Sequence, residues 1–414
     1  MRIAQINAVC SSGSTGKLVR ELHDYLGAHG NECRVYYGSE DTAYDDAVRI
    51  GSRKDQLEHA LESRMSGIQG HGSKAPTRRL ISQLEEFAPD AVHLHNLHAN
   101  YLNYPILLRW LAANDVPTVV TLHDCWFFTG KCTYPAIAGC VRWQDACGHC
   151  PQLKSDRGNP TWFFDRTATE LAEKKALFES VPRLGVVGVS DWITSEVRKS
   201  FFGSSGAQIT RIYNWVDADV FKPLGSEARE SVRAAYGLES GGRMYLAVCS
   251  GLSERKGWPT LRELAEKLDD NEQLLVVGAN PQGLETPANL SLIAPISEPA
   301  RLAELYGAAD VCVNATQAET FGLVTAEALA CGTQVVVNPN TASPELVEPG
   351  CGRVLGSDGE VGELVAYLRS DEAVKSDESV ARCVQSAGRF NRDARCNDYL
   401  EFYEKMIRME GSEL

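Results

Sequence analysis

Two carboxylates, Glu319 and Glu327, flank a Phe-Gly pair with seven residues between them. The apolar run at 310–314 predicts a buried strand before them, and a helix is expected to follow Gly322 and to end at 331–333. The pair therefore lies at a junction between a strand and a helix, which is where open α/β sheets bind ligands.

This junction suits a ligand that has hydroxyls at both ends and a phosphate between them. Gly322 lets a phosphate approach the backbone, and the N–H groups that begin the helix attract an anion. The two glutamates cannot touch one another, but each can accept hydrogen bonds from one end of an elongated ligand such as a nucleotide-sugar. Taken alone, the pattern fits an acidic helix start with one solvated glutamate equally well.

A basic pair that could hold the phosphate follows another predicted strand, at 244–250. Arg255 offers a planar fork of donors and Lys256 a compact charge, and both suit phosphate oxygens. A solvated turn is the simpler interpretation of either residue alone. The basic pair and the Glu-Gly-Glu junction are much more specific when they occur within one α/β unit.

Several segments here resemble the donor half of retaining GT-B glycosyltransferases of family four (glycosyl transferases group 1), which includes lipopolysaccharide and capsule enzymes. They are residues 250–257, 302–310 and 319–332, and the pair Pro344-Glu345. A further segment resembles the interdomain segment of that family; it runs from Asn214 to Asp217 and is followed by Phe221 and Pro223. Trp215 replaces a usual Gly and Gln334 a usual Pro, but neither change removes a group with a chemical role. The resemblance spans nearly the whole chain.

The resemblance implies a transferase that moves a sugar from a nucleotide-sugar to a glycan or lipid-linked glycan, in exopolysaccharide or cell-surface polysaccharide synthesis. It implies catalytic roles for Arg255, Lys256, His123 and Glu319, and donor contacts for Gly16, Phe321, Gly322, Leu323 and Glu327. Arg255 and Lys256 would neutralise the leaving phosphate, so catalysis is expected to need no cofactor. The alternatives are a nucleotide-sugar epimerase of the same fold and a non-catalytic carbohydrate-binding protein.

The loop from Ser11 to Lys17 follows the first predicted strand and begins a helix. It fails as a Walker loop, because Ser11 stands where the first Gly belongs and Leu18 where Ser or Thr should follow the Lys. In the resembled family this loop faces the donor phosphates and the acceptor. Gly16 is our candidate for that contact, ahead of Lys17.

All nine histidines lie within the first 150 residues. His93, His95 and His98 cluster at the end of one predicted strand, and His123 ends another. A histidine at a strand end is usually structural, but two strand ends that carry histidines at one sheet edge favour a site. His123 matches the family histidine that lies beside the reacting carbon of the donor sugar, and Asp124 is a weaker candidate.

An insert at 124–155 carries Cys132, Cys140, Cys147 and Cys150, which offer four thiolates and one C-x2-C pair. Four such ligands suit a structural zinc, which we favour over free thiols, disulfides or an iron–sulfur cluster. The insert resembles a subgroup that makes exopolysaccharides of the colanic-acid type. Its aromatic residues either stack on a sugar or pack internally; they are Trp126, Phe127, Phe128 and Trp143.

The composition is that of a globular protein, with 43% hydrophobic and 23% charged residues. The net charge of −14 argues against a nucleic-acid partner. No apolar run is long enough to span a bilayer. Most of the 13 cysteines are scattered singly, which fits a reducing cytoplasm. Peripheral contact with the inner membrane face would need a local basic patch such as Lys74, Arg78 and Arg79, although a solvated helix start is the simpler interpretation.

Strand–helix alternation runs through all 414 residues and predicts parallel sheets covered by helices on both faces. We expect an α/β protein of the GT-B type, with two Rossmann-like, doubly wound domains that face each other across a cleft. The expected domains are 1–217 on the acceptor side, 218–390 for the nucleotide-sugar, and a terminal helix within 391–414 that packs back on the first domain.

Overall fold

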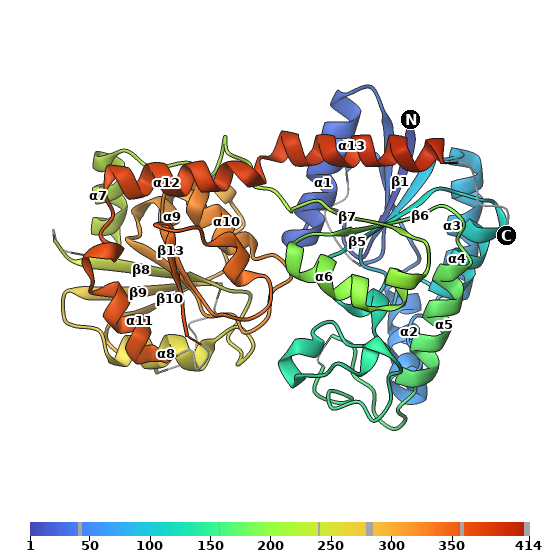
Figure 1. The fold of residues 1–414 in the computed structure, drawn as a ribbon, viewed down its shortest axis with the longest axis horizontal. Helices are drawn as coiled ribbons and strands as arrows, with labels where there is room; N and C mark the ends of the chain where they lie inside the picture. Colours follow the sequence, from blue (N-terminus) through green and yellow to red (C-terminus); the bar gives the residue numbers. More distant parts are fainter. Residues whose placement is uncertain (40–43, 157, 239–240, 279–284, 357–359, 410–414) are drawn as a thin grey trace. The chain divides into compact units, whose positions relative to one another are not determined.

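The computed structural model describes residues 1–39, 44–156, 158–238, 241–278, 285–356 and 360–409. The chain forms two compact units, each built on its own sheet (Figure 1). Unit 1 comprises Met1–Tyr213 and Asp393–Leu414, and unit 2 comprises Asn214–Arg392. The unit boundaries therefore fall four residues before, and two residues after, the expected boundaries at 217 and 390.

Unit 1 contains a seven-stranded parallel sheet with the strand order β3-β2-β1-β4-β5-β6-β7. Its strands are β1 (Arg2–Asn7), β2 (Glu32–Tyr37), β3 (Ala47–Arg49), β4 (Ala91–Leu94), β5 (Thr118–Leu122), β6 (Leu184–Gly188) and β7 (Gln208–Arg211). The helices are α1 (Gly13–Ala28), α2 (Arg53–Ser66), α3 (Lys74–Phe87), α4 (Tyr104–Ala113), α5 (Thr167–Glu179), α6 (Asp191–Lys199) and α13 (Arg392–Arg408). Strands β4, β5 and β6 are buried along their whole length, as expected for a parallel sheet with helices on both faces.

Unit 2 contains a six-stranded parallel sheet with the order β10-β9-β8-β11-β12-β13. Its strands are β8 (Arg243–Val248), β9 (Glu272–Val277), β10 (Leu290–Ile293), β11 (Val311–Asn314), β12 (Gln334–Val337) and β13 (Gly352–Val354). The helices are α7 (Ser226–Ala235), α8 (Trp258–Glu266), α9 (Pro299–Ala308), α10 (Leu323–Ala330), α11 (Val361–Leu368) and α12 (Asp377–Ala387). In both sheets the strand order reverses beside the first strand of the unit, so the doubly wound α/β prediction is confirmed.

The terminal helix α13, red in Figure 1, returns to the sheet of unit 1. The Tyr403 hydroxyl lies 2.6 Å from Nδ1 of His93 on β4, and the Tyr399 hydroxyl lies 2.9 Å from Oγ1 of Thr121 on β5. Nε2 of His93 lies 2.7 Å from the same threonine oxygen. These buried contacts tie the end of the chain to the two central strands.

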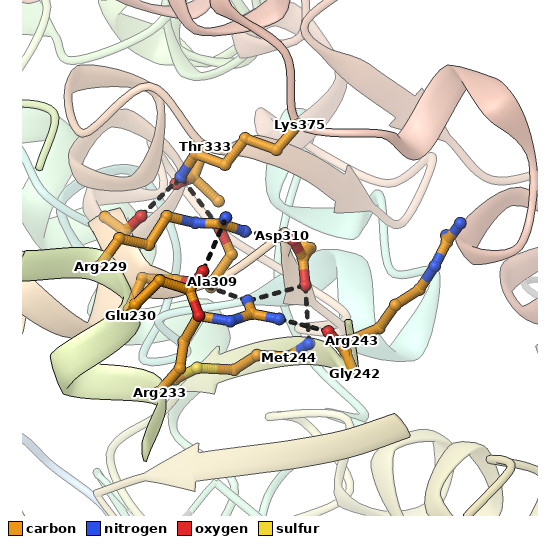
Figure 2. Close-up of polar contacts among 12 residues, drawn as sticks. Arg229, Glu230, Arg233, Gly242, Arg243, Met244, Ala309, Asp310, Thr333 and Lys375 are labelled. Carbon is orange, nitrogen blue, oxygen red and sulfur yellow. Dashed lines mark hydrogen bonds and ion pairs between the residues drawn. The ribbon is translucent and has the colours of Figure 1, made fainter. Parts of the chain in front are cut away.

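One charged cluster holds together the starts of β8 and β11 in unit 2 (Figure 2). Asp310 accepts hydrogen bonds from Arg229, from Nη1 of Arg233 at 3.0 Å and from the Met244 backbone N–H at 2.7 Å. Lys375 donates nearby to Oγ1 of Thr333 at 2.7 Å and to backbone carbonyls at the end of α9. Because Asp310 precedes β11, this cluster lies at the opposite edge of the sheet from the strand ends described next.

Candidate functional site

An ion pair at the carboxyl edge of the unit 2 sheet joins the two segments that the sequence singled out. Nζ of Lys256, in the loop after β8, lies 2.9 Å from Oε1 of Glu319, in the loop after β11. Both side chains are mostly buried, with 15% and 17% of their side-chain surface exposed. The parallel sheet brings these loops together because β8 and β11 are neighbours and end at the same edge.

Backbone contacts hold these two loops in fixed positions. The Gln317 N–H donates to the carbonyl of Arg255 at 2.8 Å. Gly257 begins α8 at φ +76°, and a Cβ on it would lie 2.2 Å from the carbonyl oxygen of Ala315. Glycine is therefore required here both by its backbone angle and by the close approach of the second loop.

A third loop, after β12, supports Glu319. Its Thr341 hydroxyl oxygen accepts from the Glu319 N–H at 2.9 Å, and Nδ2 of Asn338 donates to the carbonyl of Ala315 at 2.7 Å. Sequence reasoning missed both residues. The signal that could have found them is their place just after a buried strand next to β11 in the sheet.

Helix α10 presents its N-terminus beside this cluster. Gly322 precedes the helix at φ +102°, and no side chain caps the helix. A Cβ on Gly322 would have no neighbour closer than 3.6 Å, so the backbone angle, not crowding, favours glycine there. Phe321 is buried against Phe390, with ring centroids 5.2 Å apart, so it can contact a ligand only through its backbone. Leu323 is the first residue of the helix.

Glu327 lies inside α10, away from the Lys256–Glu319 pair. It is only 9% exposed, and its Oε2 accepts a hydrogen bond of 3.1 Å from the hydroxyl of Tyr306 on α9. Burial and the nearby carboxylate raise the pKa of Tyr306 well above its ordinary value, so this phenol remains a donor. The contact fixes one oxygen of Glu327.

In unit 1, Gly16 lies in the first turns of α1 and is buried. A Cβ there would lie 2.8 Å from the carbonyl carbon of Ser11 and 3.1 Å from Val9. Close packing of the helix on the preceding loop therefore requires a glycine at this position. Nζ of Lys17 lies 3.9 Å from Oε1 of Glu21, one turn further along the helix.

A chain of hydrogen bonds leads from Gln5 on β1 to His123 at the end of β5. Oε1 of Gln5 lies 3.0 Å from Nε2 of His95, and Nδ1 of His95 lies 3.0 Å from Nε2 of His123. The amide nitrogen of Gln5 donates to the carbonyl of Val19 at 3.3 Å, so its oxygen must be the acceptor for His95. His95 consequently carries its proton on Nε2 and accepts from Nε2–H of His123.

Burial lowers the pKa of His95 well below its ordinary value and that of His123 to about 4, so both rings are neutral near pH 7. The relay therefore sets the tautomer of His123, with the proton on Nε2 and a lone pair on Nδ1. This is a fixed acceptor at the carboxyl edge of the sheet.

Asp124 and His98 form a second pair at this edge, with 2.8 Å between Oδ2 and Nε2. The other oxygen of Asp124 accepts from the Trp126 N–H at 2.8 Å. Burial alone raises the pKa of Asp124, but the charge and hydrogen bond of His98 outweigh it and leave the pKa lowered. His93 differs from the other strand-end histidines because both of its ring nitrogens contact the residues that anchor α13.

The aromatic residues of the insert pack internally. Trp126, Phe127, Phe128 and Trp143 are each at most 2% exposed. Phe128 and Trp143 meet with ring centroids 4.9 Å apart. These four side chains are therefore too buried to stack on a sugar. Within the described residues, one group of side chains brings possible metal-ligand atoms within 4.8 Å of one another. It consists of His71, Glu170 and Glu173.

Comparison with known proteins identifies two family matches. Residues 15–220 match the family described as Glycosyltransferase Family 4, and residues 243–370 match Glycosyl transferases group 1. A colanic acid biosynthesis glycosyl transferase, WcaC of Escherichia coli K12, is 22% identical over 424 residues, covering 98% of this chain and all of that protein. A D-inositol 3-phosphate glycosyltransferase of Mycobacterium tuberculosis F11 is 32% identical over 176 residues, covering 40% of this chain and 36% of that protein.

Solved structures share the fold at low sequence identity. A sucrose-phosphate synthase from Thermosynechococcus elongatus aligns with a TM-score of 0.70 and 19% identity, covering 98% of both chains. Anabaena HepE in complex with UDP-glucose aligns at 0.65 and 17%, covering 98% of this chain and all of HepE. The lipopolysaccharide glycosyltransferase WaaG aligns at 0.63 and 18%, covering 98% of both. Among the described residues, no helix is both long and apolar enough to cross a membrane.

Proposed function

The chain belongs to glycosyltransferase family 4 and is a glycosyltransferase, and we propose that it uses a nucleotide-sugar donor and retains the anomeric configuration of the sugar. The observation that carries this proposal is the Lys256–Glu319 contact beside the uncapped start of α10. A cation and a helix N-terminus at one sheet edge would attract an anion such as the diphosphate of a nucleotide-sugar.

The leaving diphosphate is the group that this site would stabilise. As the bond to the sugar breaks, negative charge grows on the phosphate oxygens, and preorganised cations and N–H donors lower the energy of that state. Lys256 and Arg255 supply the cations in this proposal, and the backbone at Phe321, Gly322 and Leu323 supplies dipoles. HepE, which has the same fold, was solved with UDP-glucose, and this supports a donor of that class.

The two glutamates would orient the donor without reacting. Glu319 holds Lys256 with one oxygen and would accept hydrogen bonds from hydroxyls of the sugar with the other. Glu327, fixed by Tyr306, would accept a ribose hydroxyl. A covalent glycosyl-enzyme is not part of the proposal, because one oxygen of Glu319 is engaged by Lys256 and no second acid is assigned the role that a retaining hydrolase requires.

His123 would act on the sugar and acceptor side. Its neutral ring and fixed tautomer suit a hydrogen-bonding partner for a sugar hydroxyl better than a cation. We assign it a role in orienting the reacting sugar, which is the kind of positioning that lowers barriers by entropy. Gly16 would let the start of α1 approach the donor.

The acceptor is proposed to be a glycan, carried on a membrane lipid, in cell-surface polysaccharide synthesis, as the likeness to WcaC suggests. An exposed apolar surface of unit 1 supports contact with a membrane. It consists of Leu57, Leu61 and Met65 on α2, and Trp162, Phe163 and Phe164. The two parts adjoin, because the Trp162 N–H donates to the carbonyl of Arg64 on α2 at 2.8 Å. Exposed aromatic side chains of this kind favour a membrane–water interface.

Flotation of the full chain with anionic phospholipid vesicles tests this surface. We expect the wild type to float with the vesicles, and the double variant Phe163→Ser/Phe164→Ser to remain in solution. Val384→Ser, which removes an exposed apolar side chain from α12, is the matched control and should float like the wild type. Equal flotation of all three proteins would reject the surface.

Nucleotide release from a panel of UDP-, GDP- and ADP-sugars, measured with and without lipid-linked glycan, tests the reaction. Release that requires both one donor and the acceptor supports transfer. Epimerised donor in the absence of acceptor would favour the epimerase, and donor binding without turnover in any combination would favour a non-catalytic carbohydrate-binding protein.

A further inference from the structure

The insert at 124–155 brings four cysteines around one small cavity. Cys132, Cys140, Cys147 and Cys150 all line it, and its volume is about 20 Å³. A space of this size holds one water-sized particle. We propose that these four cysteines bind a single zinc ion as thiolates and that the ion holds the insert in its fold.

The turn between Cys147 and Cys150 is built to present both sulfurs together. Gly148 and His149 have φ of +129° and +48°, which bend the chain sharply between the two cysteines. Nη1 of Arg142 donates to the carbonyls of both middle residues, at 2.8 and 3.0 Å. A C-x2-C turn held in this way is the usual half of a four-cysteine zinc site.

Backbone hydrogen bonds already support the sulfurs and their loops. The Gly130 N–H donates to Sγ of Cys147 at 3.3 Å, and a donor of this kind stabilises a thiolate. The Cys150 N–H donates to Oδ2 of Asp165 at 2.7 Å, which ties the second ligand to the start of α5. Such contacts around the ligands orient them before an ion binds.

Two buried lysines next to the cluster favour an anionic centre. Lys131 and Lys174 are 2% and 0% exposed, and their ammonium groups donate only to backbone carbonyls, at distances of 2.7 to 3.0 Å. Neither has a carboxylate within 4.0 Å in the part of the chain that the structure describes. Zinc with four thiolates carries a net charge of −2, which would stabilise the protonated form of both buried amines.

The insert also needs a cross-link. Its described residues form three short 3₁₀ turns, at Trp126–Phe128, Pro135–Ala138 and Arg142–Gln144, and neither an α-helix nor a strand. Its apolar core is small, so a metal ion would contribute directly to its folding. The four sulfurs complete a tetrahedral shell and leave no position for a substrate, so the site would be structural.

The group formed by His71, Glu170 and Glu173 is a weaker candidate. Its side chains lie closer together than the four sulfurs, but Nδ1 of His71 donates to the carbonyl of Gln69 at 2.8 Å and Nε2 pairs with Glu173 at 2.8 Å. Both ring nitrogens of His71 are thus already engaged in hydrogen bonds within the protein.

Elemental analysis of the full chain, purified without chelator or metal-affinity resin, tests the proposal. We expect about one zinc per chain in the wild type, as a single tetrahedral site requires. Cys147→Ala and Cys150→Ala should each lose the metal. Cys125→Ala should keep it, because Cys125 belongs to the insert but does not line the cavity. His149→Gly should also keep it, and glycine accepts the positive φ of that position.

Thiol titration of the wild type gives a second readout that does not depend on how the variants fold. Four thiols should become reactive when a strong chelator removes the zinc, and the thermal unfolding temperature should fall. The proposal is overturned by wild-type protein that lacks zinc, by iron in its place, by disulfides among the four cysteines, or by full zinc retention in both Cys147→Ala and Cys150→Ala.

Discussion

The Lys256 ammonium is held by one carboxylate, at a point where the backbone of three loops is fixed. Glu319 keeps this cation at the strand ends, and Thr341 keeps Glu319 in place. Such preorganisation matters because a cation that is already oriented need not reorganise when charge develops on a leaving group. We therefore expect loss of the Lys256–Glu319 contact to lower kcat more than it lowers the free energy of unfolding.

Replacing Lys256 by Ala should reduce kcat by about 100-fold or more, since it removes a preorganised cation from the leaving phosphate. The fold should persist, because the side chain lies at a loop. Acceptor-dependent nucleotide release measures the change. Lys267→Ala, which removes an exposed lysine paired with Glu263 at 3.4 Å, is the control and should retain wild-type turnover. Undiminished turnover in Lys256→Ala would rule out the leaving-group role.

Replacing Gln5 by Leu should allow His123 to adopt either neutral tautomer, because His95 then loses the acceptor that holds its proton on Nε2. We expect kcat to fall by about tenfold, or ~1.4 kcal/mol of barrier, with little change in donor affinity. Nitrogen chemical shifts of the His123 ring report the tautomer directly. An unchanged tautomer together with unchanged kcat would show that the relay has no positioning role.

Elements far apart in the sequence meet at two places, one in each unit. The loops after β8, β11 and β12 meet because these strands end at one sheet edge, and α13 meets β4 and β5 through two tyrosines. The contact between α13 and the first sheet depends on buried polar groups. Breaking one of them should cost more than an average surface hydrogen bond, because it leaves a buried partner unsatisfied.

Tyr403→Phe should lower the free energy of unfolding by about 1–3 kcal/mol, since Nδ1 of buried His93 loses its partner. Urea unfolding followed by circular dichroism measures the change. Tyr236→Phe is the control, because the hydroxyl of Tyr236 has no partner among the described residues, and it should unfold like the wild type. A Tyr403→Phe protein as stable as the wild type would mean that the contact does not anchor α13.

The strands of the fold could largely be predicted from the sequence, because buried parallel strands are short apolar runs. The edge strands β3 and β13 could not, because each has three residues and no fully buried position. Lys256 and Glu319 could be assigned to one α/β unit from the sequence because each follows an obvious strand, but their direct contact was not predicted. The contacts of Thr341 with Glu319 and of Gln5 with His95 could not be predicted, since the choice of partner depends on strand order and on side-chain direction.

At the scale of the whole molecule, the buried histidines make stability sensitive to acid. Burial lowers the pKa of His59 and His123 to about 4 and lowers those of His93 and His95 well below the ordinary value. The unfolded chain then binds more protons than the folded one below about pH 6.5. Glu170 acts in the opposite sense, because burial raises its pKa to about 7 and the folded state takes up its proton first.

The free energy of unfolding should therefore decrease from pH 6.5 to 5, by up to about 1.4 kcal/mol per pH unit for each buried histidine, less the same amount for Glu170. Urea unfolding at pH 7, 6 and 5 measures this slope. Constant or rising stability over that range would show that these histidines are charged or solvated in the folded protein.

Retaining transfer from a nucleotide-sugar is tested most directly by the anomeric configuration of the product. Once the panel has identified the donor, the anomeric proton coupling and carbon shift of the transferred sugar can be read by NMR before the product is hydrolysed. We predict that an α-linked donor gives an α-linked product, with one nucleoside diphosphate released per sugar. A β-linked product from the same donor would contradict it.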